Sequence, residues 1–154
     1  MNLKTDKCKD IVWNKHYKVN TDSFDGKRKH VTRSEYTIYT DGSKIDNQVG
    51  AGAVIYHKNN LITTIKTKLP DTATVFQAEL LGIKSGCEFF FNNSVHKPKY
   101  VKITSDSQAA LQALNNNTFT SSTALSTAEA ISNLSWIAKR VTLAWTRAHV
   151  GTEG

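Results

Sequence analysis

Apolar and polar positions along the chain first predict a strand over residues 36–40. Every residue from Tyr36 to Thr40 is β-branched or aromatic, so both faces of this strand are expected to be buried. Asp41 follows at its expected end, and Gly42-Ser43 behind it is a turn signal that lets backbone approach a ligand. Ligands of open α/β sheets bind outside the carboxyl ends of strands, so Asp41 is a candidate site residue.

Two further strands are predicted over residues 48–56 and 61–69. The turn signals Asp46-Asn47 and Asn59-Asn60 connect them to each other and to the first strand. Such short connections require antiparallel pairing, so the first three strands form a meander.

A helix is predicted next, after Pro70 ends the third strand. Thr74 and Gln77 have the spacing of a capping box, and the helix is expected to end at about residue 92. Its expected core face is a stripe of four residues: Phe76, Leu80, Ile83 and Cys87.

The rest of the chain predicts a parallel addition to this meander. A strand over 100–105 is reached through a helix, so it should lie parallel to the first strand, and Asp106 follows it. Helices over 108–115 and 121–140 and a strand over 141–147 complete the pattern. We therefore predict an α/β fold with a mixed five-stranded sheet in the order 3-2-1-4-5, strand 2 antiparallel, and helices packed on it.

Three acidic residues are predicted to meet at one edge of this sheet. Asp41 and Asp106 follow neighbouring parallel strands, and Glu79 lies in the second turn of the first helix. Carboxylates gathered in this way repel one another unless a cation lies between them. Oxygen ligands without Cys or His favour Mg²⁺ or Mn²⁺ over zinc.

Composition limits the class of protein. The 154 residues, 39% of them hydrophobic, are about enough for one domain with its own core. The chain contains no run of eighteen apolar residues, and its first residues lack the apolar core of a signal peptide, which predicts an intracellular protein, cytoplasmic or nuclear. Cys8 and Cys87 lie far apart and are expected to be free thiols.

The positive charge is concentrated near the N-terminus. Residues 1–33 contain nine Lys and Arg and four Asp, a net charge of +5 out of +7 for the chain. We expect these residues to be an extension of a domain that spans 34–154. They are either a solvated linker or a segment that contacts nucleic acid.

Four short motifs occur in order on the predicted strand ends and on the first helix. They are Tyr-Thr-Asp-Gly-Ser at 39–43, Gln-Ala-Glu-Leu at 77–80, Thr-Ser-Asp-Ser-Gln at 104–108 and Trp-Thr-Arg-Ala-His-Val-Gly at 145–151. Together they resemble the motifs of ribonuclease H over residues 34–154. The residues of these motifs are most similar to those of the ribonuclease H domains that follow the reverse transcriptase in non-LTR retrotransposons. Four motifs in order are far more specific than one.

The resemblance implies a two-metal endonuclease that hydrolyses the RNA strand of RNA–DNA hybrids and leaves a 5′-phosphate. Asp41 would bridge two Mg²⁺ ions, for which Mn²⁺ can substitute, and Glu79 and Asp106 would hold one of these ions. His149 resembles a mobile histidine that assists proton transfer or product release. An exposed loop histidine without a role is the alternative.

The resemblance also implies contacts with the hybrid. Gly42, Ser43 and Gln108 match positions that touch the substrate, where 2′-hydroxyls distinguish RNA from DNA. A turn serine and a neighbour of a helix N-cap are the alternative interpretations of Ser43 and Gln108.

Two departures from the family pattern lead to further expectations. The family continues into a final helix with a fourth acidic residue, whereas this sequence stops at Gly154, so impaired hydrolysis is expected. Residues 115–122 lack the basic, Trp-containing protrusion with which stand-alone enzymes hold the hybrid. Substrate affinity would then come from the basic extension or from a reverse transcriptase partner.

Two other functions remain open at this point. One is a catalytically inactive fragment that binds hybrid or RNA. The other is DNA cleavage of the integrase or transposase type on a related fold. Those families lack the combination of the Gln-Ala-Glu-Leu helix and the Trp-to-Gly motif, which favours the ribonuclease.

Overall fold

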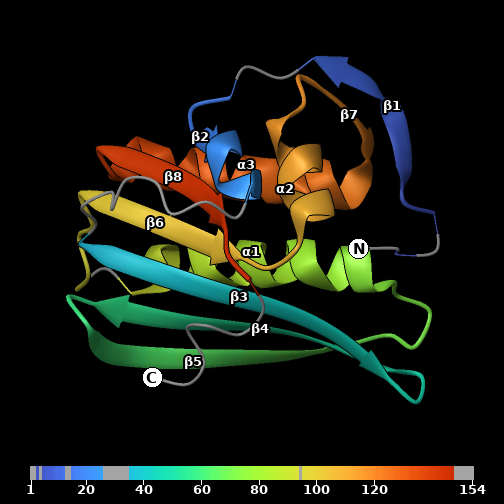
Figure 1. The fold of residues 1–154 in the computed structure, drawn as a ribbon, viewed down its shortest axis with the longest axis horizontal. Coiled ribbons are helices and arrows are strands. Elements are labelled where there is room, and N and C mark those ends of the chain that lie inside the picture. The colour runs from blue at the N-terminus through green and yellow to red at the C-terminus, as the bar shows by residue number, and fades with distance from the viewer. Residues whose placement is uncertain (1–2, 4, 13–14, 26–34, 94, 148–154) are drawn as a thin grey trace.

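A mixed sheet of six strands forms the centre of the computed structural model, which describes residues 3, 5–12, 15–25, 35–93 and 95–147. The strand order is β2-β8-β6-β3-β4-β5, and Figure 1 shows β3, β6 and β8 pointing in the same direction. The strands are β2 (Lys18–Asn20), β3 (Tyr36–Ile45), β4 (Gln48–His57), β5 (Asn60–Leu69), β6 (Tyr100–Ser105) and β8 (Arg140–Trp145). The predicted order of five strands is confirmed, and β2 adds a sixth, parallel to β8.

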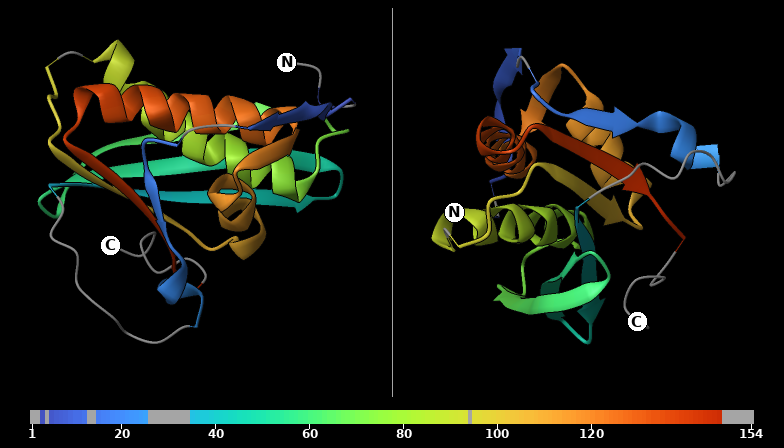
Figure 2. Two further views of the ribbon diagram at one scale, coloured as in Figure 1. Left: turned by 90° about the horizontal axis from the view of Figure 1, so that it is seen from above. Right: turned by 90° about the vertical axis from the view of Figure 1, so that its left-hand side faces the viewer.

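Three α-helices accompany the sheet, and two of them cover one of its faces. They are α1 (Val75–Asn92), α2 (Gln108–Asn115) and α3 (Ser122–Ile137). Figure 2 shows α1 and α3 side by side against the sheet. The predicted capping box is present, with Gln77 N donating to Thr74 Oγ1 at 3.1 Å and Thr74 N donating to Gln77 Oε1 at 2.8 Å. Leu80, Ile83 and Cys87 are fully buried, whereas Phe76 is partly buried.

Some predicted boundaries are wrong. β3 continues past Asp41 to Ile45, because residues 42–45 pair with β4. The second turn is centred on Lys58-Asn59, whose φ values are 49° and 71°, whereas the first is at Asp46-Asn47 as predicted. The third helix is shorter than predicted and occupies Ser122–Ile137, and the last strand is Arg140–Trp145 rather than 141–147.

Described parts of the N-terminal extension pack onto the domain. β1 (Lys7–Val12) pairs antiparallel with β7 (Thr118–Ser121), a short strand that the sequence pattern did not predict. β2 joins the edge of the main sheet, and the 3₁₀ helix η1 (Thr21–Asp25) follows it. The division of the chain at residue 33 stays a prediction, but residues 15–25 are not a free linker.

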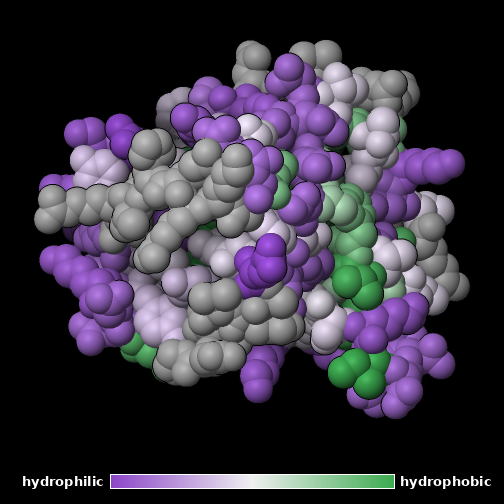
Figure 3. Space-filling view, viewed as in Figure 1, coloured by the Kyte–Doolittle hydropathy of each residue, from purple (hydrophilic) through white to green (hydrophobic). Residues whose placement is uncertain are grey.

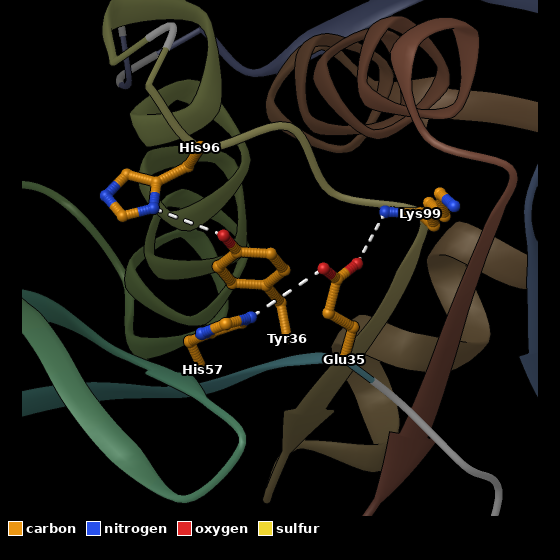
Figure 4. Close-up of polar contacts among 5 residues, drawn as sticks. All are labelled: Glu35, Tyr36, His57, His96 and Lys99. Atoms are coloured by element: carbon orange, nitrogen blue, oxygen red, sulfur yellow. Dashed lines mark hydrogen bonds and ion pairs between the residues drawn. The ribbon is translucent and has the colours of Figure 1, made fainter.

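A polar cluster fixes the start of β3, five residues before Asp41 (Figure 4). Glu35 accepts a hydrogen bond from Lys99 N at 2.8 Å and lies 3.7 Å from His57 Nε2. The Tyr36 hydroxyl lies 3.2 Å from His96 Nδ1, and its ring stacks at 4.6 Å on His57. These contacts join β3, β4 and the connection before β6.

The described surface on the side seen in Figure 1 is mainly hydrophilic (Figure 3). Within the part of the chain that the structure describes, no helix combines the length and the apolar character needed to span a membrane. Cys8 and Cys87 are free thiols, as predicted.

Candidate active site

Three carboxyl groups from three elements meet where β3 and β6 separate. Pairing between β3 and β6 ends at Thr40 and Ser105, so Asp41 and Asp106 are the next residues of two neighbouring parallel strands. Glu79 comes from α1, which packs against β3. One ligand oxygen of each of the three lies within 4.8 Å of the others. The structure therefore brings together the three acids that the sequence singled out.

Glu79 reaches this cluster because α1 approaches β3 very closely at Gly42. A Cβ atom at Gly42 would lie 2.6 Å from Glu79 N and 2.7 Å from Glu79 Oε1. Gly82, one turn further along α1, would place a Cβ 2.9 Å from Gly52 O. Only residues without a Cβ allow this helix and sheet to be in such contact. Gly42 thus makes room for Glu79, and its predicted contact with substrate stays a prediction.

Burial makes the acid cluster electrostatically unfavourable without a counterion. Glu79 is only 6% exposed. Burial, together with the Asp106 carboxyl group through hydrogen bonding and charge, and the charge of Asp41, raises the pKa of Glu79 to about 8, although a backbone hydrogen bond from Gly42 opposes the shift. Oε1 of Glu79 and Oδ1 of Asp106 are buried and have no hydrogen-bond partner among the described residues.

These properties fit a divalent cation. Two buried carboxylate oxygens without a partner face a third carboxylate, and all the donors are hard oxygens. Mg²⁺ and Mn²⁺ prefer such donors, whereas no Cys or His belongs to the cluster. A bound cation would also remove the repulsion that raises the pKa of Glu79.

Asp106 is held by the end of β8 through Trp145, whose role the sequence did not indicate. The indole Nε1 of Trp145 donates to Asp106 O at 3.0 Å, and Thr146 N donates to Ser105 O at 2.9 Å. Ser105 is fully buried, and its hydroxyl accepts a hydrogen bond from Ser107 N at 3.1 Å. The loop that carries Asp106 is therefore fixed from both sides.

The N-terminal extension also reaches this edge of the sheet. Ser23 Oγ accepts a hydrogen bond from Trp145 N at 2.9 Å. Gln108 Nε2 donates to Phe24 O at 3.2 Å, so η1 holds the amide of a predicted substrate contact. The side-chain oxygen of Gln108 can still accept a hydrogen bond from a ligand, and its second amide hydrogen can still donate one.

The remaining predicted residues lie as follows. Ser43 is exposed and lines a groove of about 570 Å³ that starts at Asp41 and crosses β4 and β5. Lys66 and Lys68 of β5 line the same groove. His149 lies outside the described residues, so its predicted role stays a prediction.

Residues 33–154 match the RNase H family. The chain belongs to that family. No curated protein sequence matches the chain significantly.

Solved structures show the same fold. An N-terminal RNase H domain from Mycobacterium tuberculosis, solved as a fusion with maltose-binding protein, is 17% identical with a TM-score of 0.65, over 79% of this chain and 88% of that one. RNase H1 of the halophilic archaeon Halobacterium salinarum is 15% identical with a TM-score of 0.59, over 73% of this chain and 86% of that one. LC11-RNase H1, solved in complex with an RNA/DNA hybrid, is 16% identical with a TM-score of 0.63, over 77% of this chain and 90% of that one.

Proposed function

We propose that this RNase H domain is a metal-dependent endonuclease that hydrolyses the RNA strand of RNA–DNA hybrids. The observation that supports it most is the cluster of Asp41, Glu79 and Asp106 within 4.8 Å, on the strands and helix where the family motifs occur. The similarity to an enzyme solved with a hybrid agrees with this substrate.

The three carboxyl groups of Asp41, Glu79 and Asp106 would hold Mg²⁺ or Mn²⁺. When bound, such ions stabilise the negative charge that develops on the attacking water and on the leaving 3′ oxygen. Glu79 projects from a buried part of α1, and Trp145 holds the backbone of Asp106, so the main chain that carries both carboxyl groups is in place before substrate binds. His149 would accept or deliver a proton near the leaving product.

The groove along β4 and β5 would receive the hybrid. Ser43 lies beside Asp41 at its start, and the cations Lys66 and Lys68 lie further along it. Lysine contacts to phosphates supply affinity without sequence preference. Gln108, with its amide nitrogen bound to Phe24 O, presents an oxygen that can accept a hydrogen bond from a ribose 2′-hydroxyl.

The proposal includes a place in a retroelement polyprotein, beside a reverse transcriptase domain. The residues of the four motifs, which resemble those of retrotransposon ribonuclease H domains, support this place. Hybrids arise during reverse transcription, so the protein would act in the cytoplasm or nucleus.

Cleavage of matched hybrid, duplex DNA and duplex RNA with Mg²⁺ or Mn²⁺ tests the proposal. We expect cut RNA with 5′-phosphate ends from the hybrid only, and no cleavage by Asp41→Asn. Glu129→Gln removes a carboxylate from the exposed side of α3 and should cleave like the parent. Cleavage retained in Asp41→Asn would refute the role of the cluster. Hybrid binding without cleavage by the parent chain would support the impaired, hybrid-binding alternative, and cleavage of duplex DNA would support the integrase-like one.

A further inference from the structure

A cavity of about 710 Å³ lies where β2 joins the main sheet, apart from the groove beside Asp41. Four of its described lining residues are cations, and one is an acid, Asp22, which gives a net formal charge of +3. The cations are Lys18, Lys102, Lys139 and Arg140. We call this site the β2 cavity.

The strand register places three of these cations on one face of the sheet. Lys18 of β2 and Lys102 of β6 both pair with Thr142 of β8. Arg140 precedes Thr142 by two residues in the same strand, so its side chain points to the same face. One strand separates Lys18 from Lys102, so their Cα atoms are roughly 10 Å apart. The alternate residues Val141 and Leu143 are buried on the other face.

No described acid forms an ion pair with these cations, although Asp22 lines the same cavity and offsets one of their charges. The ion pair found within the described residues joins His57 to Glu35, an acid near the cavity whose backbone N donates to Tyr100 O at 3.2 Å. Lys139 and Arg140 each lie 5.9 Å from the centre of the Tyr100 ring, a cation–π arrangement that orders them and leaves their charge intact. Like charges held together in this way favour binding of an anion.

The β2 cavity lies within reach of the nucleic acid that would occupy the acid cluster. Lys102 pairs with Thr37, and Asp41 follows Thr37 by four residues on the same face of β3. At about 3.3 Å per residue this separation is roughly 13 Å. A duplex carries phosphates along both strands, so a hybrid held at Asp41 has phosphates at this distance.

We propose that the β2 cavity binds the phosphodiester backbone of the hybrid away from the cleaved phosphate. This inference rests on the proposed function, and it gives the described part of the basic extension a role in substrate binding. Contacts to phosphates position a duplex without reading its sequence. The site therefore strengthens binding of any hybrid and leaves the chemistry at Asp41 unchanged.

Binding of a fluorescent hybrid in EDTA, measured by anisotropy over a range of salt concentrations, tests this site without cleavage. Lys18→Gln/Lys102→Gln should lower the slope of log affinity against log salt by about 2, because each phosphate contact contributes about one counterion. Lys58→Gln/Lys97→Gln removes the same charge from exposed positions outside the cavity and should leave the slope unchanged. With Mg²⁺, the first variant should show a raised KM and an unchanged kcat.

Lys139→Gln/Arg140→Gln repeats the test at the start of β8, should the first variant fold poorly by circular dichroism. Equal slopes for cavity and control variants would overturn the inference and leave the proposed function standing. An affinity lowered equally in both would also overturn it, because it would show an effect of net charge alone. If the parent chain binds no hybrid at all, the inference and the proposed function are both wrong.

Discussion

Gly42 and Glu79 are in such close contact that any side chain on Gly42 would overlap the carboxyl group it helps to place. A Cβ there would lie 2.6 Å from Glu79 N and 2.7 Å from Glu79 Oε1. The atoms in the way belong partly to the backbone of α1, which cannot rotate aside as a side chain can. The separation of helix and strand at this point therefore determines whether Glu79 can share a ligand with Asp41.

Gly42→Ala should impair both folding and catalysis. We expect a loss of about 1–3 kcal/mol in the free energy of unfolding, as for other overpacked contacts. Cleavage should fall by more than this loss explains, because α1 and Glu79 move away from Asp41. Denaturant unfolding and kcat on one preparation measure both effects.

Gly50→Ala is the matched control for stability. The nearest atoms to a Cβ at Gly50 are Thr67 O at 3.6 Å and Ser43 Oγ at 3.9 Å, which are ordinary contacts. Its free energy of unfolding should change little. Equal destabilisation by the two substitutions would show that the contact with Glu79 has no special importance.

The same glycine shows where prediction from sequence succeeded and failed. Gly42-Ser43 has the composition of a turn, which favoured ending the strand at Asp41, yet the strand continues to Ile45. Glycine serves here to admit a helix, and that requirement depends on α1, far along the chain. Helix caps and the alternation of apolar and polar residues depend only on residues that are close in sequence. The limits of β6 and α2 were therefore predicted correctly.

Elements stabilised by distant partners could not be predicted in this way. β2 has three residues, which is too short for a recognisable alternation of apolar and polar positions, and it is stabilised by its pairing with β8. β7 has four residues and pairs with β1 across more than 100 residues of sequence. The meeting of Asp41 and Asp106 was predictable because parallel strands end at a common edge. The hydrogen bond from Trp145 to Asp106 O required the tertiary structure.

Stability without metal should fall as the pH rises from about 5 to 8. The pKa of Glu79 is raised to about 8 from an ordinary value of 4.5, so the folded state keeps a proton that the unfolded chain loses. The unfolded state then binds fewer protons, and the free energy of unfolding decreases with pH across this window. Melting temperatures in EDTA should follow this trend.

Glu79→Gln should flatten this pH dependence, because the amide does not ionise. Glu129→Gln, on the exposed side of α3, should retain it. An equally steep decline in Glu79→Gln would mean that another group causes the dependence.

Divalent cations should raise the melting temperature at pH 8. Ions that bind the folded acid cluster and not the unfolded chain stabilise the fold by about 2.7 kcal/mol at 100 times their dissociation constant. The stabilisation should be much smaller in Asp106→Asn, which loses one of the clustered donors. A melting temperature that Mn²⁺ leaves unchanged would argue against a metal site.

Ser23→Ala should weaken catalysis through Trp145, although Ser23 lies outside the residues matched to the family. Its hydroxyl accepts from Trp145 N at 2.9 Å and donates to Asn20 O at 2.6 Å, so it fixes the residue whose indole holds Asp106. Loss of the acceptor should cost about 1–2 kcal/mol of stability.

Catalysis should respond in kcat rather than in KM, because Asp106 is displaced while phosphate contacts remain. Ser135→Ala is the matched control, since Ser135 also makes one short hydrogen bond, to Ser132 O at 2.7 Å, on α3 away from the acids. That variant should lose stability without a specific loss of kcat. Ser23→Thr keeps a hydroxyl and should recover much of the activity. If Ser23→Ala and Ser135→Ala lose activity only in proportion to stability, the extension supports the fold and does not position Asp106.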